Sequence, residues 1–142
     1  MIRELMHDPI FLARRSTPAQ CADKAIAEDL ADTLRAHREN CAGMAANMIG
    51  CTRRIIAFWE GDAVTVLWNP TIVKHEEPYD TAEGCLSLCG DPRKVKRYRK
   101  ITVVYEIPAR EGDTLIQRTR RFSGFTAQVI QHEIDHCDGV LI

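Results

Sequence analysis

VIQHEIDHCDGVLI, residues 129–142, is typical of a helix that carries histidines and a glutamate among apolar side chains. Four apolar residues keep the spacing of one helical face: Phe125, Val129, Ile130 and Ile134. Ser123 is a residue type that commonly caps the start of a helix, and Gly139 is one that commonly ends it. We therefore predict a C-terminal helix between these two residues, buried along its apolar face.

Within this helix, His132, Glu133 and His136 form the pattern H-E-x-x-H. Histidines four residues apart lie one above the other, about 5–6 Å apart at Cβ, so both imidazoles can bind one ion. Glu133 is turned by about 100° around the helix axis. It can act there as a general base on a water bound to the metal without being a ligand itself.

Two histidines at this spacing can also occur by chance on a surface or in a core. The apolar neighbours of the pattern indicate burial, and buried polar groups without partners are costly. A metal ion would satisfy them, so the pattern favours a metal site over a chance pairing.

The third ligand of such a site is expected upstream. One zinc-protease pattern, H-E-x-x-H-x-x-G-x-x-H, matches at Gly139 but would need a histidine where Ile142 stands. Another protease type uses a glutamate well after the helix, and no residue follows Ile142. The upstream candidates are the cysteines, the carboxylates and three histidines, which are His7, His37 and His75.

Among these candidates, the stretch EGCLS (83–87) is the most suggestive. Cys85 follows Gly84, a residue type used where the backbone turns sharply or approaches another group closely. A thiolate and two imidazoles suit Zn²⁺ or Fe²⁺ and leave a fourth position for water. The alternative for Cys85 is a thiol packed as a small hydrophobic side chain.

Length, charge and cysteine content limit the domain number, the partners and the compartment that the sequence allows. The 142 residues are expected to form a single domain, 1–142. A formal net charge of −1, from 19 basic and 20 acidic residues, predicts neither a membrane nor a specific nucleic acid as a partner. The N-terminus is too broken by charge to be a secretory signal. The six cysteines include no C-x-x-C pair, so we expect free thiols in a reducing, cytoplasmic compartment and no structural zinc ribbon.

The predicted fold class is α+β. Residues 19–39 indicate an amphipathic helix, because Ile26, Leu30 and Leu34 recur every four residues. Short strands, mainly antiparallel, are predicted after the small-residue loop CAGMAANMIG (41–50), with a break at Pro70. Their expected ranges are 53–59, 64–69, 71–75, 100–106 and 114–122. The C-terminal helix should pack on or within this sheet.

EGCLS and QHEIDH, preceded by the loop CAGMAANM, resemble the three motifs of the peptide deformylases. In that family the motifs read Gly-x-Gly-x-Ala-Ala-x-Gln, Glu-Gly-Cys-x-Ser and His-Glu-x-Asp-His. The resemblance covers nearly the whole chain in the right order, and two of the three motifs are intact. It implies a metal-dependent hydrolase that removes the formyl group from N-formyl-methionyl peptides of new proteins.

The resemblance also implies residue roles. Cys85, His132 and His136 would bind one divalent metal ion, natively Fe²⁺, with Zn²⁺ or Ni²⁺ as alternatives. Glu133 would take a proton from the attacking water and pass it to the departing amine. Leu86 would donate its backbone N–H to the formyl oxygen. The implied substrate-binding residues are Ala42, Gly43, Met48 and Gly84.

The first motif departs from the family pattern at two positions. Cys41 stands where the family has its first glycine, and Met48 stands where it has glutamine. That glutamine is expected to donate a hydrogen bond to the oxyanion, and methionine has no N–H to give. Losing such a donor typically costs about 10²–10³ in rate, so we expect slowed turnover. The alternative is a catalytically impaired, metal-binding relative with a binding or regulatory role. A small metalloprotease is disfavoured by the missing downstream ligand.

Three further features complete the predictions. Asp135 is expected to pair with an arginine, and Arg97 is the candidate. The basic run RKVKRYRK (93–100) could meet ribosomal RNA during transient proximity to the ribosome, but a solvated edge strand or loop is the favoured interpretation. Cys89 is interpreted as a bystander thiol rather than a second ligand.

Overall fold

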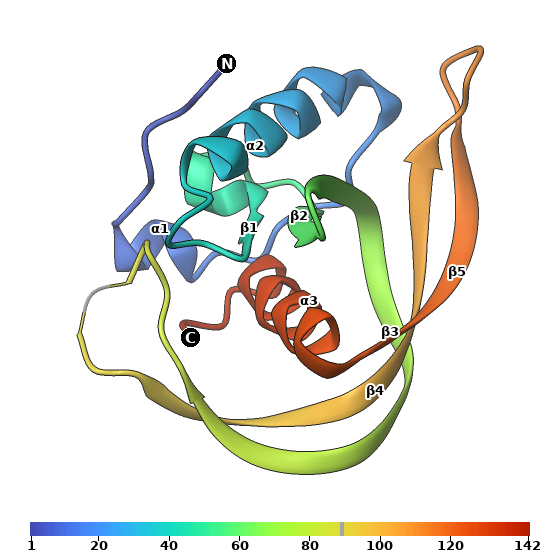
Figure 1. Ribbon diagram of the computed structural model, residues 1–142. Helices are drawn as coiled ribbons and strands as arrows, with labels where there is room; N and C mark the ends of the chain where they lie inside the picture. The colour runs from blue at the N-terminus through green and yellow to red at the C-terminus, as the bar shows by residue number, and fades with distance from the viewer. Residues whose placement is uncertain (89) are drawn as a thin grey trace.

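The computed structural model describes residues 1–88 and 90–142, and it confirms the α+β class (Figure 1). In this part of the chain, an antiparallel sheet has the strand order β1-β2-β3-β4-β5. The strands are β1 (Gly43–Ala45), β2 (Ile55–Glu60), β3 (Ala63–Glu83), β4 (Arg93–Pro108) and β5 (Leu115–Ser123). The helices are α1 (Pro9–Leu12), η1 (Cys21–Asp23), α2 (Lys24–Ala36), η2 (Ala46–Ile49) and α3 (Gly124–Cys137).

The hairpin of β3 and β4 is long and strongly curved, and Figure 1 shows it wrapping around α3. The prediction of a break at Pro70 is corrected, because β3 runs through this residue. Its pairing register with β4 shifts between Trp68 and Thr71, where Pro70 has no N–H to donate and Asn69 adopts a φ of 49°. Such a bulge bends a strand and increases its twist, which lets the hairpin curve around the helix.

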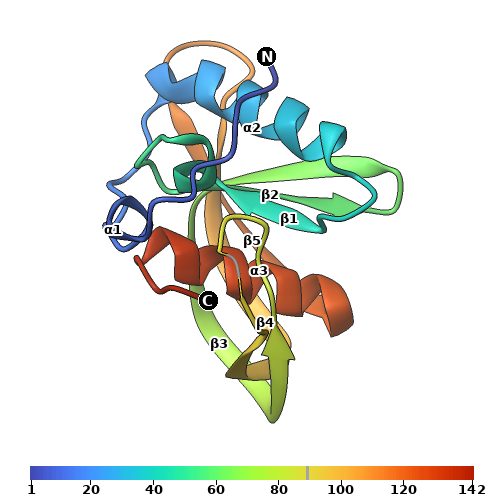
Figure 2. The same cartoon turned by 90° about the vertical axis from the view of Figure 1, so that its left-hand side faces the viewer.

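Strand β2 has a hydrophobic cluster on each of its two faces. Its side chains alternate, so Ile56 and Phe58 join one hydrophobic cluster while Ile55 and Ala57 join another. The first cluster lies between the sheet and α3, and the second lies between β2, η2 and α2. Figure 2 shows α2 and α3 on opposite sides of β1 and β2.

Helix α2 occupies the middle of the predicted range 19–39, with the short helix η1 directly before it. Leu30 and Leu34 are fully buried in the second cluster, and Ile26 is partly buried against it. The predicted apolar stripe therefore is the face that packs on the sheet.

The C-terminal helix α3 begins after Ser123, which is its N-cap, and ends at Cys137. Gly139 adopts a φ of 76°, and the N–H of Val140 donates to the carbonyl of Asp135 at 2.9 Å, which closes the end of the helix. Gln131 ties the helix to β4, because its side chain exchanges two hydrogen bonds of 2.8 Å with the backbone of Tyr98. The helix is thereby held inside the curved hairpin.

The basic run 93–100 forms the first half of β4 and pairs with β3, whereas β5 pairs with β4 only from Lys100 onward. Most of its cationic side chains are exposed, and Lys100 pairs with Glu77. Arg93 is partly exposed, and Arg97 is buried at 5% exposure and turns toward α3. Within residues 1–88 and 90–142, none of the helices is both long and apolar enough to cross a membrane.

Candidate metal centre

Three potential ligands from two elements meet in one place. Cys85 lies in the loop after β3, and His132 and His136 lie one turn apart on α3. The Nε2 atoms of the two histidines are 3.0 Å apart, and Cys85 Sγ is 3.4 Å from His136 Nε2. The three ligand atoms lie within 4.8 Å of one another. In the part of the chain that the structure describes, this is the one such group of His, Cys, Asp and Glu.

These residues fit a divalent transition metal. One sulfur and two imidazole nitrogens form a donor set that suits zinc or iron and leaves a position for a reacting group. Burial and the neighbouring His132 lower the pKa of His136 to about 3, so its ring stays neutral, as a ligand must be. The side chain of His136 is fully buried, and among the described residues its Nδ1 has no partner. Its other nitrogen, Nε2, faces the ligand cluster.

Glu83 orients the first histidine. Its Oε1 lies 2.8 Å from Nδ1 of His132, which therefore carries a proton. Burial would lower the pKa of His132, but hydrogen bonds with Cys85 and Glu83 outweigh it and raise the pKa to about 10, so a metal would displace the second proton from Nε2. Burial would raise the pKa of Glu83, but hydrogen bonds from His132, Arg97 and Gln128 outweigh it and lower the pKa to about 2. The carboxylate is therefore ionised at neutral pH and holds the ring in the tautomer that a metal requires.

Arg97 joins this carboxylate to the rest of α3. Its guanidinium makes a forked contact with Glu83, with Nη2 at 2.7 Å from Oε1 and Nε at 3.0 Å from Oε2. Its Nη1 donates to Asp135 at 2.7 Å, which confirms the predicted pairing of Asp135 with Arg97. The side chains of Arg97 and Glu83 are only 6% and 8% exposed, so removing either charge would break a buried ion pair.

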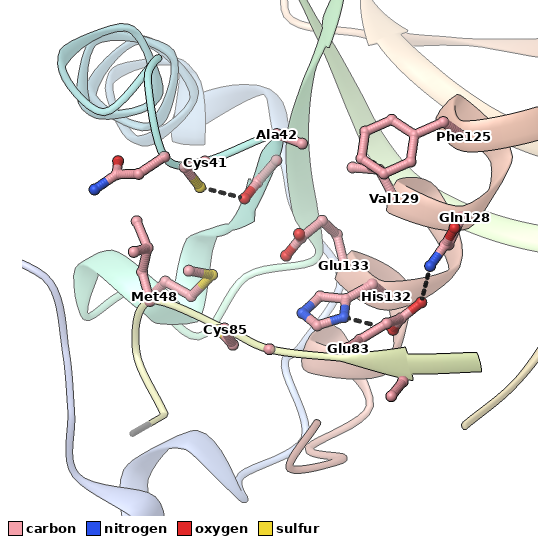
Figure 3. Close-up of a pocket in the computed structure, with 15 residues that line it drawn as sticks. Cys41, Ala42, Met48, Glu83, Cys85, Phe125, Gln128, Val129, His132 and Glu133 are labelled. Carbon is pink, nitrogen blue, oxygen red and sulfur yellow. Dashed lines mark hydrogen bonds and ion pairs between the residues drawn. The ribbon is translucent and has the colours of Figure 1, made fainter. Parts of the chain in front are cut away.

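Glu133 faces the same space from the next position on the helix, and Figure 3 shows its carboxylate directed into the pocket. The residue is 4% exposed, and its Oε1 has no hydrogen-bond partner in residues 1–88 and 90–142. Burial, aided by the charge of Glu83, raises the pKa of Glu133 to about 7. A carboxylate with this pKa can both accept and return a proton near neutral pH.

The ligand cluster opens into a pocket of about 460 Å³ (Figure 3). Among the residues that line the pocket are eight of the nine predicted site residues: Ala42, Gly43, Met48, Gly84, Cys85, Leu86, His132 and Glu133. The ninth, His136, lies beneath the pocket and is fully buried. The predicted residues therefore come together from β1, η2, the loop after β3 and α3.

The two departures in the first motif both place sulfur on the backbone of β1. Cys41 Sγ donates to the carbonyl of Gly43 at 2.9 Å, and Met48 Sδ accepts from the N–H of Ala45 at 3.4 Å. Burial and the nearby charge of Glu133 raise the pKa of the Cys41 thiol to about 12, so it stays protonated. Met48 is 1% exposed and lines the pocket without offering a donor.

The three histidines considered as upstream ligands lie elsewhere. His7 contacts the carbonyl of Ser87, His37 contacts the carbonyl of Thr33, and His75 stacks on Tyr98. Cys89 lies outside the described residues. Sequence reasoning missed the roles of Glu83, which accepts from His132, and of Gln128, which donates to Glu83. The sequence offered one indication of the role of Glu83, because this residue is the first of the motif EGCLS.

The fold and the site define a class of protein: an α+β hydrolase-like chain in which a Cys–His–His cluster that could hold a metal ion lies beside a buried glutamate. A family model described as polypeptide deformylase matches residues 3–142. The chain is 45% identical over 142 residues to a peptide deformylase of Clostridium beijerinckii, covering 100% of both chains. It is 36% identical over 134 residues to peptide deformylase 2 of Clostridium acetobutylicum, covering 92% of this chain and 85% of that one.

Solved structures of peptide deformylases share the fold of this chain. The peptide deformylase of Thermus thermophilus superposes with a TM-score of 0.81 at 33% identity, over 99% of this chain and 83% of that chain. A peptide deformylase of Legionella pneumophila gives a TM-score of 0.80 at 30% identity, over 99% and 83% of the two chains. The chain belongs to the polypeptide deformylase family, whose members are metal-dependent.

Proposed function

We propose that Cys85, His132 and His136 hold the metal ion of this peptide deformylase and that Glu133 is its general base. The enzyme removes the formyl group from N-formyl-methionyl peptides of nascent proteins. One observation carries the residue assignment. A sulfur and two imidazole nitrogens converge within 4.8 Å beside a buried carboxylate at the base of a pocket.

Iron as Fe²⁺ is the proposed native metal, on the resemblance of the motifs, and Zn²⁺ or Ni²⁺ are the alternatives. When bound, the ion supplies Lewis-acid polarisation and makes water a stronger acid. The donor set supports this proposal, because thiolate and imidazole suit all three metals. Cys85 also makes the site sensitive to oxidation, since a thiolate can be oxidised in steps to sulfenic and higher acids.

Glu133 carries the proton in the proposed reaction. Its carboxylate takes a proton from the attacking water and then gives it to the nitrogen of the departing peptide, whose bond to the formyl carbon breaks. The raised pKa, about 7, supports both transfers near neutral pH. The carboxylate oxygen without a partner supports the same role, because a substrate group can reach it without displacing another bond.

The backbone around the pocket binds the peptide in this proposal. The N–H of Leu86 donates to the formyl oxygen, while Ala42, Gly43 and Gly84 lie along the peptide backbone. A side chain at Gly43 would crowd this path, since a Cβ there would lie 3.2 Å from Glu133 Oε2. Phe125 and Val129 give the pocket an apolar wall that suits the methionine side chain.

Met48 favours a second candidate function. It lines the pocket where an oxyanion donor is expected, and its sulfur is already bonded to the N–H of Ala45. A chain that keeps the metal centre but turns over slowly could serve as a binding or regulatory protein. The metal and the Leu86 N–H remain as sources of stabilisation, so the enzymatic function is preferred.

We also propose that residues 1–142 act as one domain in the cytoplasm. The substrate class supports the location, because formylated N-termini belong to chains that are still being made. Transient proximity to the ribosome follows from the same argument, and the exposed lysines of the basic run, such as Lys94 and Lys96, offer a surface for it.

The test is turnover of a formyl-Met tripeptide by iron- or nickel-loaded protein under anaerobic conditions. Turnover is measured as the release of formate. We expect measurable hydrolysis that is lost in Cys85→Ser, together with one metal ion per chain in the wild type. A filled metal site with no detectable turnover would overturn the enzymatic proposal and favour the binding protein. Cleavage of unformylated peptides would contradict both.

A further inference from the structure

Residues 3–7, here called the N-terminal strap, cross α2 and continue toward α1 (Figure 2). The strap is fixed at its start, where the N–H of Arg3 donates to Thr33 Oγ1 at 2.9 Å and the Arg3 side chain pairs with the buried Asp29 at 2.7 Å. Leu5 packs against the second hydrophobic cluster. The strap is therefore held on α2 by both polar and apolar contacts.

The strap is also fixed directly after its last residue. Asp8 caps α1 by accepting the N–H of Ile10 at 3.0 Å, and Pro9 stands in the first turn of that helix. Leu12 at the end of α1 is fully buried. His7 thus lies between two anchored segments, which limits the positions that its ring can reach.

Two consecutive strap residues bond two separate motifs of the active site. The N–H of Met6 donates to the carbonyl of Met48 at 2.7 Å, in the first motif. The Nδ1 of His7 lies 3.1 Å from the carbonyl of Ser87, in the second motif. A carbonyl oxygen only accepts, so Nδ1 of His7 carries the hydrogen. The strap therefore bonds two separate segments that both contribute residues to the lining of the pocket.

The loop of the second motif makes few other hydrogen bonds. Between Glu83 and Arg93, the hydrogen bonds of the described residues are a local one from Leu88 to Cys85 at 3.3 Å, the contact of Cys85 with His136, and the one from His7. Ser87 is 1% exposed, and its hydroxyl has no partner among those residues. Cys85 and Leu86 also pack against the second hydrophobic cluster. Among the described residues, His7 makes the one hydrogen bond that reaches the loop from outside both the loop and the metal centre.

We propose that His7 is a positioning residue: by holding the Ser87 carbonyl, it fixes the orientation of the Cys85 thiol and the Leu86 N–H. The inference rests on the roles proposed above for Cys85 and Leu86. His7 itself is exposed and does not line the pocket, so it acts through the loop and does not touch the substrate.

The test compares three substitutions. Asn places an N–H donor at the δ position of the side chain, so His7→Asn keeps the bond, whereas His7→Leu has the same branching without a donor. His37→Leu is the matched control, because it removes a histidine whose Nδ1 contacts the carbonyl of Thr33 at 3.0 Å, in α2. A single hydrogen bond contributes about 0.5–1.5 kcal/mol, so we expect His7→Leu to lower kcat about 2- to 10-fold with little change in KM. His7→Asn and His37→Leu should stay within about twofold of wild type.

A second readout does not depend on turnover. In metal-free protein, the rate of Cys85 alkylation reports how freely the loop moves, and tandem mass spectrometry separates Cys85 from Cys89. We expect His7→Leu to speed Cys85 alkylation about 2- to 10-fold, and His7→Asn to restore the wild-type rate. The fully buried Cys137 is the internal control and should react no faster in any variant.

Each outcome decides the proposal. Equal values for wild type and His7→Leu in both readouts would overturn it. Equal impairment of His7→Leu and His7→Asn would also overturn it, because the donor would then not be the cause. Faster alkylation of Cys137 alongside Cys85 would indicate general loosening and count against it. If no variant turns over substrate, the proposed function fails, and the alkylation rates still decide whether His7 holds the loop.

Discussion

The two walls of the pocket are built very differently. On the metal side, His132 is held by Glu83, which is held in turn by Arg97 and Gln128, and Arg97 also reaches Asp135. On the opposite side, the loop 41–48 departs from its family motif at two positions, and sulfur atoms satisfy its backbone. Charged hydrogen bonds in a buried setting are roughly twice as strong as neutral ones, whereas thiols and thioethers are weak partners.

This difference predicts where substitution should cost the most stability. A change at Arg97 or Glu83 breaks an ion pair whose two side chains are both buried. A change at Cys41 or Met48 removes only a weak sulfur hydrogen bond, whereas Asn47 in the same loop donates to the carbonyl of His136 at 3.0 Å. We therefore expect changes at Cys41 and Met48 to tune the rate, and changes on the metal side to affect stability and metal binding.

The largest effect is expected at the residue between the two walls, Glu133. Glu133→Gln keeps the size of the side chain and removes the ability to accept a proton. We expect kcat to fall about 10²–10⁴-fold, since general acid–base catalysis contributes that much. Metal content, measured on the same sample, should stay at the wild-type level because Glu133 is not a ligand. A variant with more than a tenth of wild-type kcat would show that another group moves the proton.

Arg97→Met probes the metal side directly. It leaves Glu83 buried at 8% exposure without its cation, and such a loss typically costs about 3–5 kcal/mol in the free energy of unfolding. Metal affinity should fall about 10–100-fold, because Glu83 then holds His132 less firmly. Urea unfolding of the metal-free protein and metal titration measure the two effects. The double variant Glu83→Gln with Arg97→Met should recover part of the stability, and a cost below about 1 kcal/mol for Arg97→Met would contradict the assigned role.

Met48→Gln probes the loop side. The glutamine Oε1 can take the place of Met48 Sδ and accept the N–H of Ala45, which leaves its amide N–H free for the pocket. Since one oxyanion donor is worth about 10²–10³ in rate, we expect kcat to rise by up to about 10²-fold. Met48→Leu is the matched control and should leave kcat within about twofold of wild type. A glutamine variant no faster than wild type would mean that the missing donor does not limit the reaction.

Much of the metal side could be predicted from the sequence because its signals are local. The spacing of His132 and His136 places both rings on one helix face whatever the rest of the fold does. Cys85 was the most suggestive of several upstream candidates, because it follows Gly84, and the resemblance of the motifs then supported it. The pairing of Asp135 with Arg97 was also predicted and is confirmed.

The contacts of Glu83 could not be predicted in the same way. Its partners His132 and Gln128 lie 49 and 45 residues away in the chain, and they meet only because the hairpin of β3 and β4 curves around α3. That curvature depends on a bulge near Pro70, where a propensity argument predicts a break. Such contacts follow from how whole elements pack, and no spacing within one element reports them.

Gly43→Ala tests how closely the loop wall approaches the helix. A Cβ at Gly43 would lie 2.6 Å from Val129 Cγ1 and 3.2 Å from Glu133 Oε2, so neighbouring atoms must shift. Overpacking of this kind costs about 1–3 kcal/mol in the free energy of unfolding. Gly84→Ala is the matched control on the other wall, because a Cβ there meets nothing within 4 Å. Equal stability of the two variants in urea would show that the loop can yield without cost.

Glu60→Gln tests whether burial accounts for the large contribution to stability that we expect from the pair of Arg97 and Glu83. Arg120 makes a forked contact with Glu60 through two hydrogen bonds of 2.9 Å, much as Arg97 does with Glu83, but the two side chains are 41% and 32% exposed. An exposed pair contributes only about 0.2–1 kcal/mol, so Glu60→Gln should cost no more than this in the free energy of unfolding at pH 7.

The contribution of Glu60 to the free energy of unfolding should depend on pH in the acidic range. Hydrogen bonds from Arg120 lower the pKa of Glu60 from its ordinary value of 4.5, so the folded state favours the ionised carboxylate. That contribution is fully present above pH 4.5 and is lost as the pH falls through the lower pKa of the folded state. Urea unfolding should therefore show the wild type and Glu60→Gln converging below pH 4.5. A cost at pH 7 as large as that of Arg97→Met would mean that forked geometry, rather than burial, accounts for the strength of the metal side.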